Sequence, residues 1–219
     1  MNYAMRFALA LTFLFSSGHF APKQAANGGS EPQIVIDNRY VRVSRADFNP
    51  GEQSNYTVPD KVSAVVIRLR IPKTGDKDSA LQLDRVQFMD DGMMATHSDP
   101  SGSFREVRIE LKSDPPATPF EKDAVKLDPG HNILLDENDH FRVVQVHFGP
   151  GEQGPIVDKR PRVIIVLVDS KAQVVKPGGS PEERDATAGQ IQWSLGGRQS
   201  TINGRQGRLE NTVVEIKAH

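Results

Sequence analysis

The sequence predicts an all-β protein in which one sandwich or barrel unit occurs twice. The phrase Phe48-Asn-Pro-Gly-Glu-Gln53 recurs 100 positions later as Phe148-Gly-Pro-Gly-Glu-Gln153. Short apolar or alternating runs, separated by turn residues, surround each copy in the same order. No segment has helical periodicity of useful length. A repeat at this spacing sets the architecture, because each copy marks the same point of a repeated structural unit.

Composition narrows the class of protein. The 219 residues are 37% hydrophobic and suit one large domain or two small ones. The net charge is −1, with no clustered basic face, so the sequence predicts no binding to nucleic acid. Cysteine is absent, which excludes disulfides, thiol nucleophiles and thiolate metal sites. Stability must therefore come from burial.

Residues 1–26 are predicted to be a signal peptide and the start of a disordered tether. Arg6 precedes an apolar run at 7–15 that is short for a bilayer span. Three small residues qualify as the end of the signal: Gly18, Ala21 and Ala26. Retention as an uncleaved anchor is the alternative. We expect an exported protein, periplasmic or secreted in a bacterium, with no membrane span after cleavage.

The first unit is expected at 33–112. Its predicted strands are 34–36, 40–48, 62–71, 81–89 and 104–111. The β-branched run at 62–71 suits a strand buried on both faces. The apolar alternation slips near Ala46, which suggests a bulge. Residues 92–103 are expected to form a loop, and the strand after it alternates apolar with charged residues.

A proline-rich linker is expected at 113–130, with a short helix in 120–127. The second unit, at 131–218, repeats the first. Its matching segments are 133–135, 141–143, 163–168, 190–193 and 212–217. The offset between the units grows from 100 to 105 residues, so the second unit has gained residues in its middle loop.

This order of elements resembles the cupin superfamily, in a bicupin-like arrangement. Val-x-x-x-x-Phe-x-Pro-Gly-Glu-Gln, followed by a β-branched strand, resembles the opening cupin motif. Gln192-Trp193, then 197–203 and 213–217, resemble the second motif and the last strand. The resemblance implies two tandem double-stranded β-helix (jelly-roll) barrels after the signal segment.

The residues that hold the metal in typical cupins are missing. Such cupins use His-x-His shortly after Pro-Gly-Glu and a third histidine in the second motif, which places the imidazoles on one face inside the barrel. In this chain the corresponding positions are Thr57, Pro59 and Met94 in the first unit and Val157, Lys159 and Gln199 in the second. No alignment slip creates His-x-His, because the chain contains no such pair. The resemblance therefore implies no metal and no cofactor.

His97 is the histidine nearest to a motif. A metal site centred on His97 is an alternative for which the sequence offers no second ligand, and a histidine with satisfied hydrogen bonds is the favoured interpretation. Residues at or near the motif positions are the candidates for lining a pocket: Lys159, Trp193, Gln199, Thr57 and Met94.

Two functions stay open. The favoured one is an exported bicupin without the metal site, which acts as a non-catalytic small-molecule-binding or structural module. The alternative is a metal-free or atypical cupin enzyme, isomerase- or epimerase-like or carbohydrate-related, in which Lys159 acts as a base only with a depressed pKa. The runs at 65–67 and 163–168 can pack the two barrels together within the chain or pair two chains in a homodimer.

Overall fold

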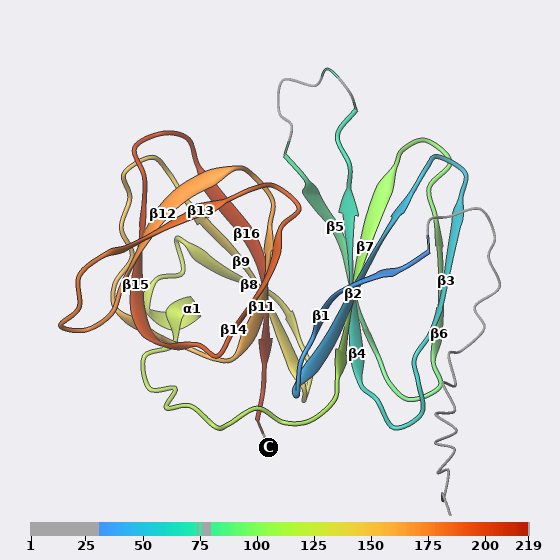
Figure 1. The fold of residues 1–219 in the computed structure, drawn as a ribbon, viewed down its shortest axis with the longest axis horizontal. Helices are drawn as coiled ribbons and strands as arrows, with labels where there is room; N and C mark the ends of the chain where they lie inside the picture. Colours follow the sequence, from blue (N-terminus) through green and yellow to red (C-terminus); the bar gives the residue numbers. More distant parts are fainter. Residues whose placement is uncertain (1–30, 74, 76–79, 219) are drawn as a thin grey trace, which may run out of the picture.

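The computed structural model describes residues 31–73, 75 and 80–218, so the predicted signal segment lies outside the described residues. The described chain folds into two β units side by side (Figure 1). The all-β prediction is confirmed, since the described part has sixteen strands and one four-residue helix. No helix in the described ranges is long and apolar enough to cross a membrane.

The first unit has a five-stranded sheet in the order β1-β2-β7-β4-β5 and a two-stranded sheet β3-β6. All pairs within it are antiparallel. Its strands are β1 Gln33–Asp37, β2 Val41–Phe48, β3 Gln53–Thr57, β4 Ala64–Arg70, β5 Gln82–Met89, β6 Met94–Ser98 and β7 Phe104–Leu111.

The second unit has a five-stranded sheet in the order β14-β11-β16-β9-β8 and a four-stranded sheet β10-β15-β12-β13. Helix α1, Ala124–Leu127, begins after the N-cap Asp123 and lies against β8 and β10, one strand from each sheet. Its strands are β8 Asn132–Glu137, β9 Phe141–Phe148, β10 Val157–Lys159, β11 Arg162–Val166, β12 Ser170–Val175, β13 Glu182–Ala186, β14 Ile191–Ser194, β15 Gly197–Asn203 and β16 Leu209–Ile216.

The repeated Pro-Gly-Glu phrase forms the same turn in both units. Gly51 and Gly151 have φ angles of 82° and 78°, the region that glycine adopts without strain after a proline. The Glu52 carboxylate accepts a hydrogen bond of 2.7 Å from the Asn49 N–H, and Glu152 accepts one from Gly149. The glycine and the glutamate of the phrase therefore have the same role in the turn of each unit.

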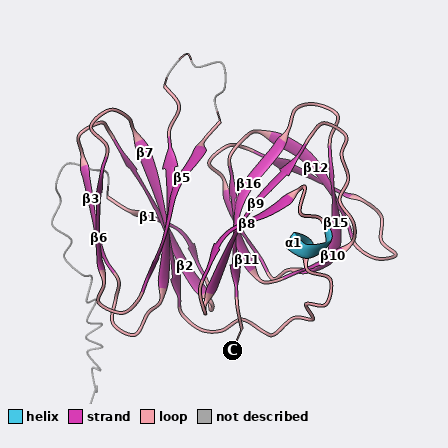
Figure 2. Cartoon of the chain, turned by 180° about the vertical axis from the view of Figure 1, so that it is seen from behind, coloured by secondary structure: helices cyan, strands magenta, loops and turns pink. Residues whose placement is uncertain are grey.

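The main apolar core lies between the two units. Val65, Ile67, Val163 and Ile165 are fully buried in one cluster to which both five-stranded sheets contribute. Both ribbon views show these two sheets next to each other in the centre, with the smaller sheets outside (Figures 1 and 2). The apolar runs therefore pack the barrels together within the chain. Pairing of two chains in a homodimer stays a prediction.

Two local expectations were wrong. The region 92–103 contains strand β6, which the sequence hides because only Ala95 and His97 of its five residues are buried. Strand β2 pairs with β7 in unbroken register, so there is no bulge at Ala46 in this pair. The apolar pattern slips there because the strand is buried on both faces, with Val43 between the barrels and Phe48 inside the first one.

Candidate functional site

The interior of the second barrel contains a cavity of about 130 Å³. Its wall comes from both sheets and from α1 of that barrel. Apolar side chains from β9, β11 and β16 cover much of it, including Val144, Ile164 and Val213. Polar side chains converge on the same space: Asn132, Lys159, Arg162, Ser170, Arg184, Gln192, Gln199, Thr201, Asn211 and Glu215. Arg184 forms an ion pair with Glu182.

A row of charged residues crosses the large sheet beside this cavity. Strand register places Glu215 of β16 between Arg142 of β9 and Arg162 of β11. Both terminal nitrogens of Arg142 donate hydrogen bonds of 3.1 Å to the carboxylate of Asp123, and Arg142 lies 3.5 Å from a Glu215 carboxylate oxygen. Burial raises the pKa of the Glu215 carboxyl, although Arg162 and Arg142 oppose this effect.

Lys159 and Arg162 line the cavity, and only 9% and 5% of their surfaces are exposed. Within the described part of the chain, no hydrogen bond or ion pair joins either side-chain cation to another residue. Burial lowers the pKa of Lys159 to about 8, and the nearby Arg162 charge adds to this effect. Burial also lowers the pKa of Arg162 to about 10, against the attraction of Glu215. Two cations thus face the cavity without a hydrogen-bond partner, although Glu215 attracts both of them.

Unpartnered acceptors are found at the same cavity. Glu215 Oε2, which is the oxygen 3.5 Å from Arg142, and Asn211 Oδ1 are buried without a hydrogen-bond partner, and both residues line it. They lie four positions apart on β16, with Val213 between them on the same face, so they mark two polar ends separated by an apolar middle. This arrangement suits a small molecule with a polar group and a hydrocarbon body.

The structure brings together two of the five residues predicted to line a pocket. Lys159 and Gln199 line the cavity of the second barrel. Trp193 lies on the other face of its sheet, in the core between the barrels, where it stacks on Tyr40 with ring centroids 6.0 Å apart. Thr57 and Met94 are exposed partners on the small sheet of the first barrel.

A one-residue slip explains why these motif positions differ between the barrels. Gln53 pairs with Ser98, whereas Gln153 pairs with Ile202, although Val157 pairs with Gln199 as the repeat predicts. One extra residue therefore lies between Gln153 and Val157, and a slip of one residue turns every side chain to the other face. If the two barrels are aligned on the Gln53–Ser98 and Gln153–Ile202 pairs, Lys159 corresponds to Val58 and Thr201 corresponds to His97.

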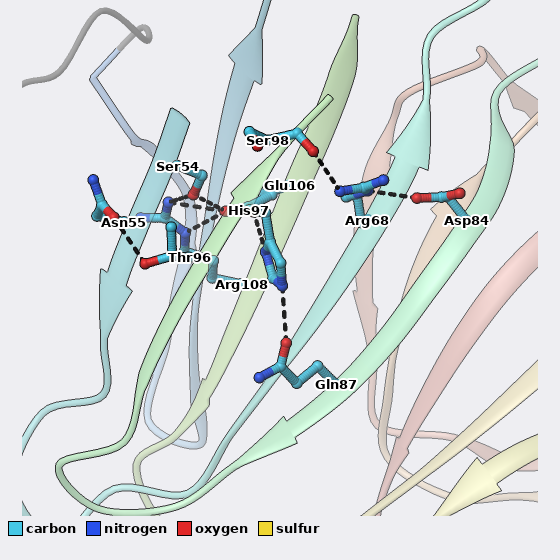
Figure 3. Close-up of polar contacts among 10 residues, drawn as sticks. All are labelled: Ser54, Asn55, Arg68, Asp84, Gln87, Thr96, His97, Ser98, Glu106 and Arg108. Carbon is cyan, nitrogen blue, oxygen red and sulfur yellow. Dashed lines mark hydrogen bonds and ion pairs between the residues drawn. The ribbon is translucent and has the colours of Figure 1, made fainter. Parts of the chain in front are cut away.

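The interior of the first barrel holds a closed polar network (Figure 3). His97 Nδ1 lies 2.6 Å from one Glu106 oxygen, and His97 Nε2 lies 2.9 Å from Gln87 Oε1. The other Glu106 oxygen accepts hydrogen bonds from the Ser54 hydroxyl at 2.5 Å and from Arg108 at 3.0 Å. These are all contacts within the barrel, so the network fills the interior with groups that satisfy one another.

The network keeps Glu106 ionised. Burial alone would raise the pKa of its carboxyl, but the hydrogen bonds from His97 and Ser54 and the charge of Arg108 outweigh burial and lower it. Arg108 also lies over the Tyr56 ring, 4.8 Å from its centroid. A carboxylate held in this way supports the fold, and its lowered pKa makes it a poor proton acceptor at neutral pH.

In the part of the chain that the structure describes, neither barrel offers a ligand set for a metal. Among the described residues, no group of three or more histidine or acidic side chains could hold an ion. Both nitrogens of His97 already contact oxygen partners, so binding a metal would require the loss of one contact. In the second barrel the cationic Lys159 and Arg162 would repel a metal ion.

Sequence reasoning missed the charged row of the second barrel. Arg142, Arg162 and Glu215 each stand within or beside an apolar run, which was the available signal. A charge in such a strand is buried only when partners or a ligand compensate for it. In the first barrel the charged members of the alternating strand, Glu106 and Arg108, face the barrel interior.

No family model matches the sequence, and no curated protein is similar to it. Similar solved structures exist. A putative glyoxylate-induced protein from Pseudomonas aeruginosa is 13% identical, with 87% of this chain and 83% of that chain covered and a TM-score of 0.54. AerE from Microcystis aeruginosa is 12% identical, with 88% and 100% covered and a TM-score of 0.53.

An oxalate decarboxylase is 9% identical, with 90% of this chain and 75% of that chain covered and a TM-score of 0.53. At these identities the similarity shows the fold alone. The predicted fold of two tandem barrels of the cupin type is confirmed.

Proposed function

We propose that this chain, a protein of the cupin fold, is a metal-free binding module whose second barrel takes up a small organic molecule. The observation that carries the proposal is the contrast between the interiors. The second barrel has a cavity with an apolar wall and a few convergent polar side chains, the usual composition of a ligand site. The first barrel is filled by its own polar network and serves as a packed support.

The proposal is metal-free because of what stands near the typical metal positions. In the second barrel Lys159 and Gln199 face the cavity, and neither they nor their neighbours form a histidine and carboxylate set. Dialysed protein is expected to carry no stoichiometric transition metal. One equivalent of iron, manganese, nickel or zinc in elemental analysis would overturn this part of the proposal.

Binding is tested directly by ligand-observed NMR with mixtures of small metabolites and the dialysed protein. The matched variant is Thr201→Phe, which places a ring in the cavity from β15. Some compounds are expected to bind the wild-type protein and not the variant, whose circular dichroism spectrum should remain that of a folded β protein. Equal binding to both proteins would mean that the ligand does not enter this cavity.

The second candidate function is a metal-free enzyme, isomerase- or epimerase-like or acting on a carbohydrate. The observation that favours it is Lys159, which faces the cavity and whose lowered pKa of about 8 leaves part of the amine neutral near pH 7. A ligand found by NMR can be incubated with the protein and followed for exchange of its C–H protons with deuterium. Exchange that is lost in Lys159→Met favours the enzyme; unchanged ligand favours the binding module.

Export is part of the proposal and rests on the sequence of residues 1–26. The measurement is the N-terminus of the mature protein, by mass spectrometry, together with fractionation of the cells. We expect a start after Gly18, Ala21 or Ala26 and recovery from the periplasm or medium. An intact Met1 in the membrane fraction would indicate an anchor.

A further inference from the structure

The cavity of the second barrel has an excess positive charge. The charged groups that act on Lys159 and Glu215 at its polar end are Lys159, Arg160, Arg162, Arg142, Glu215, Asp123 and Asp128. Four are cations and three are anions, so the group carries one positive charge when all are ionised. A buried charge without a counter-ion is strongly unfavourable, and the described residues supply no further anion in hydrogen-bonding contact with Lys159 or Arg162.

The two cations are also the ones free to reach a ligand. Arg142 is occupied by its two hydrogen bonds to Asp123. Lys159, from β10, and Arg162, from β11, line the cavity, and neither side chain forms a hydrogen bond or ion pair with another described residue. A lysine and an arginine that line the same cavity suit a carboxylate, because arginine matches its two oxygens and lysine adds a point charge.

We propose that the second barrel binds a small organic monocarboxylate, with its carboxylate between Lys159 and Arg162 and its hydrocarbon body against Val144, Ile164 and Val213. This inference rests on the proposed binding function and names the ligand class. A single negative charge balances the site, whereas a phosphate dianion would exceed it and would face Glu215. A cavity of about 130 Å³ resembles the roughly 150 Å³ cavity that accepts one benzene ring, so the body is of that size.

The test is isothermal titration calorimetry on the dialysed full chain with matched pairs of probes. Benzoate and hexanoate carry the charge, and benzamide and hexanamide have nearly the same shape without it. At least one carboxylate is expected to bind at least tenfold more tightly than its amide, and inorganic phosphate is expected to bind no more tightly than the amides. This comparison uses only the wild-type protein, so it does not depend on the folding of a variant.

Variants then locate the charge. Lys159→Met and Arg162→Met are each expected to weaken binding of the carboxylate at least tenfold, and Lys126→Met, which changes an exposed lysine of α1, is expected to leave it unchanged. Equal affinity for amide and carboxylate would overturn the monocarboxylate assignment and leave the binding function standing. Phosphate as the tightest probe, or no binding of any probe while other metabolites bind in the NMR screen, would overturn it as well.

Discussion

The five-stranded sheets of the two barrels have corresponding strand orders, but the interiors of the barrels differ. In the first barrel Glu106 and Arg108 of β7 lie in the middle of the large sheet and satisfy each other. The residues that take their places on β16 are Asn211 and Val213, whose shorter side chains leave space in the middle of the second barrel. A repeated scaffold thus gives one filled interior and one cavity.

The charges of the second barrel lie one step further along the sheet. The row Arg142, Glu215 and Arg162 corresponds by register to Arg42, Glu110 and Ala64 in the first barrel. The extra cation of the second barrel therefore stands where the first barrel has a buried alanine.

The same difference appears in the hydrogen-bonding of buried atoms. Among the described residues, completely buried side-chain atoms without a hydrogen-bond partner occur only in the second unit: Arg142 Nε, Asn203 Oδ1, Asn211 Oδ1, Thr212 Oγ1 and Glu215 Oε2. A buried polar group without a partner lowers stability, so its presence in one copy of a repeat and not the other points to a use for it. We therefore look for the function in the barrel whose buried polar atoms lack hydrogen-bond partners.

The largest expected effect comes from breaking the first interior. Glu106→Gln keeps the shape of the side chain but leaves the buried Arg108 without its counter-ion. We expect the free energy of unfolding at pH 7 to fall by about 3–5 kcal/mol, measured by chemical denaturation. Asn211→Ala, at the corresponding place in the second barrel, is the matched variant and should cost about 1 kcal/mol or less, because the amide oxygen has no partner.

The Glu106 effect should depend on pH in a defined direction. Its pKa is lowered in the folded protein, so the carboxylate contributes stability above its ordinary pKa of 4.5 and loses that contribution as the pH falls through the folded value. The difference between wild type and Glu106→Gln is therefore expected to shrink in acid. A difference that stays constant down to pH 2 would show that ionic pairing is not its source.

The second interior should respond in the opposite sense. Lys159→Met removes a buried cation and keeps an unbranched side chain of similar length, so we expect the empty protein to become more stable by about 2–3 kcal/mol at pH 7. Lys126→Met controls for the loss of an exposed lysine and should change stability by less than about 0.5 kcal/mol. A loss of stability in Lys159→Met would indicate that the amine has a structural partner.

The gain from Lys159→Met should disappear at high pH. The pKa of Lys159 is about 8 in the folded protein and 10.5 without the fold. Between these values the unfolded chain binds more protons, so the wild type gains stability as the pH rises. The difference between the two proteins is expected to narrow by about 2 kcal/mol from pH 8 to pH 10.5. Parallel unfolding curves across this range would contradict a buried, strained cation.

Much of the fold could be predicted from the sequence because repetition and alternation are local signals. The repeated turn located both units, and the β-branched run around Val65 and Ile67 was rightly expected to be buried on both faces. Strand β6 was missed because a strand that buries an alanine and a histidine has no apolar pattern.

The site could be predicted only in part. Lys159 and Gln199, which were predicted from the motif positions, line the cavity. Thr57 and Met94, predicted in the same way, are exposed on the first barrel. The two barrels differ because one extra residue between Gln153 and Val157 changes which side chains face the interior. Alternation also does not say which face is the inside. The polar face of β7 lines the interior of its own barrel, and its apolar face packs against the other barrel. This orientation depends on the packing of the two large sheets, which the alternation within one strand does not reveal.

The smallest expected change in the free energy of unfolding concerns a glutamine that is present at the same position of both units. Gln87 contacts His97 Nε2 at 2.9 Å, whereas its counterpart Gln192 lines the cavity. Gln87→Met should lower the free energy of unfolding by about 1 kcal/mol, since it leaves a ring nitrogen without its partner, and Gln192→Met should change it by less than about 0.5 kcal/mol. Chemical denaturation of both variants provides the measurement. Equal losses would mean that Gln192 also satisfies a buried group, and the second interior would then be closed in the same way as the first.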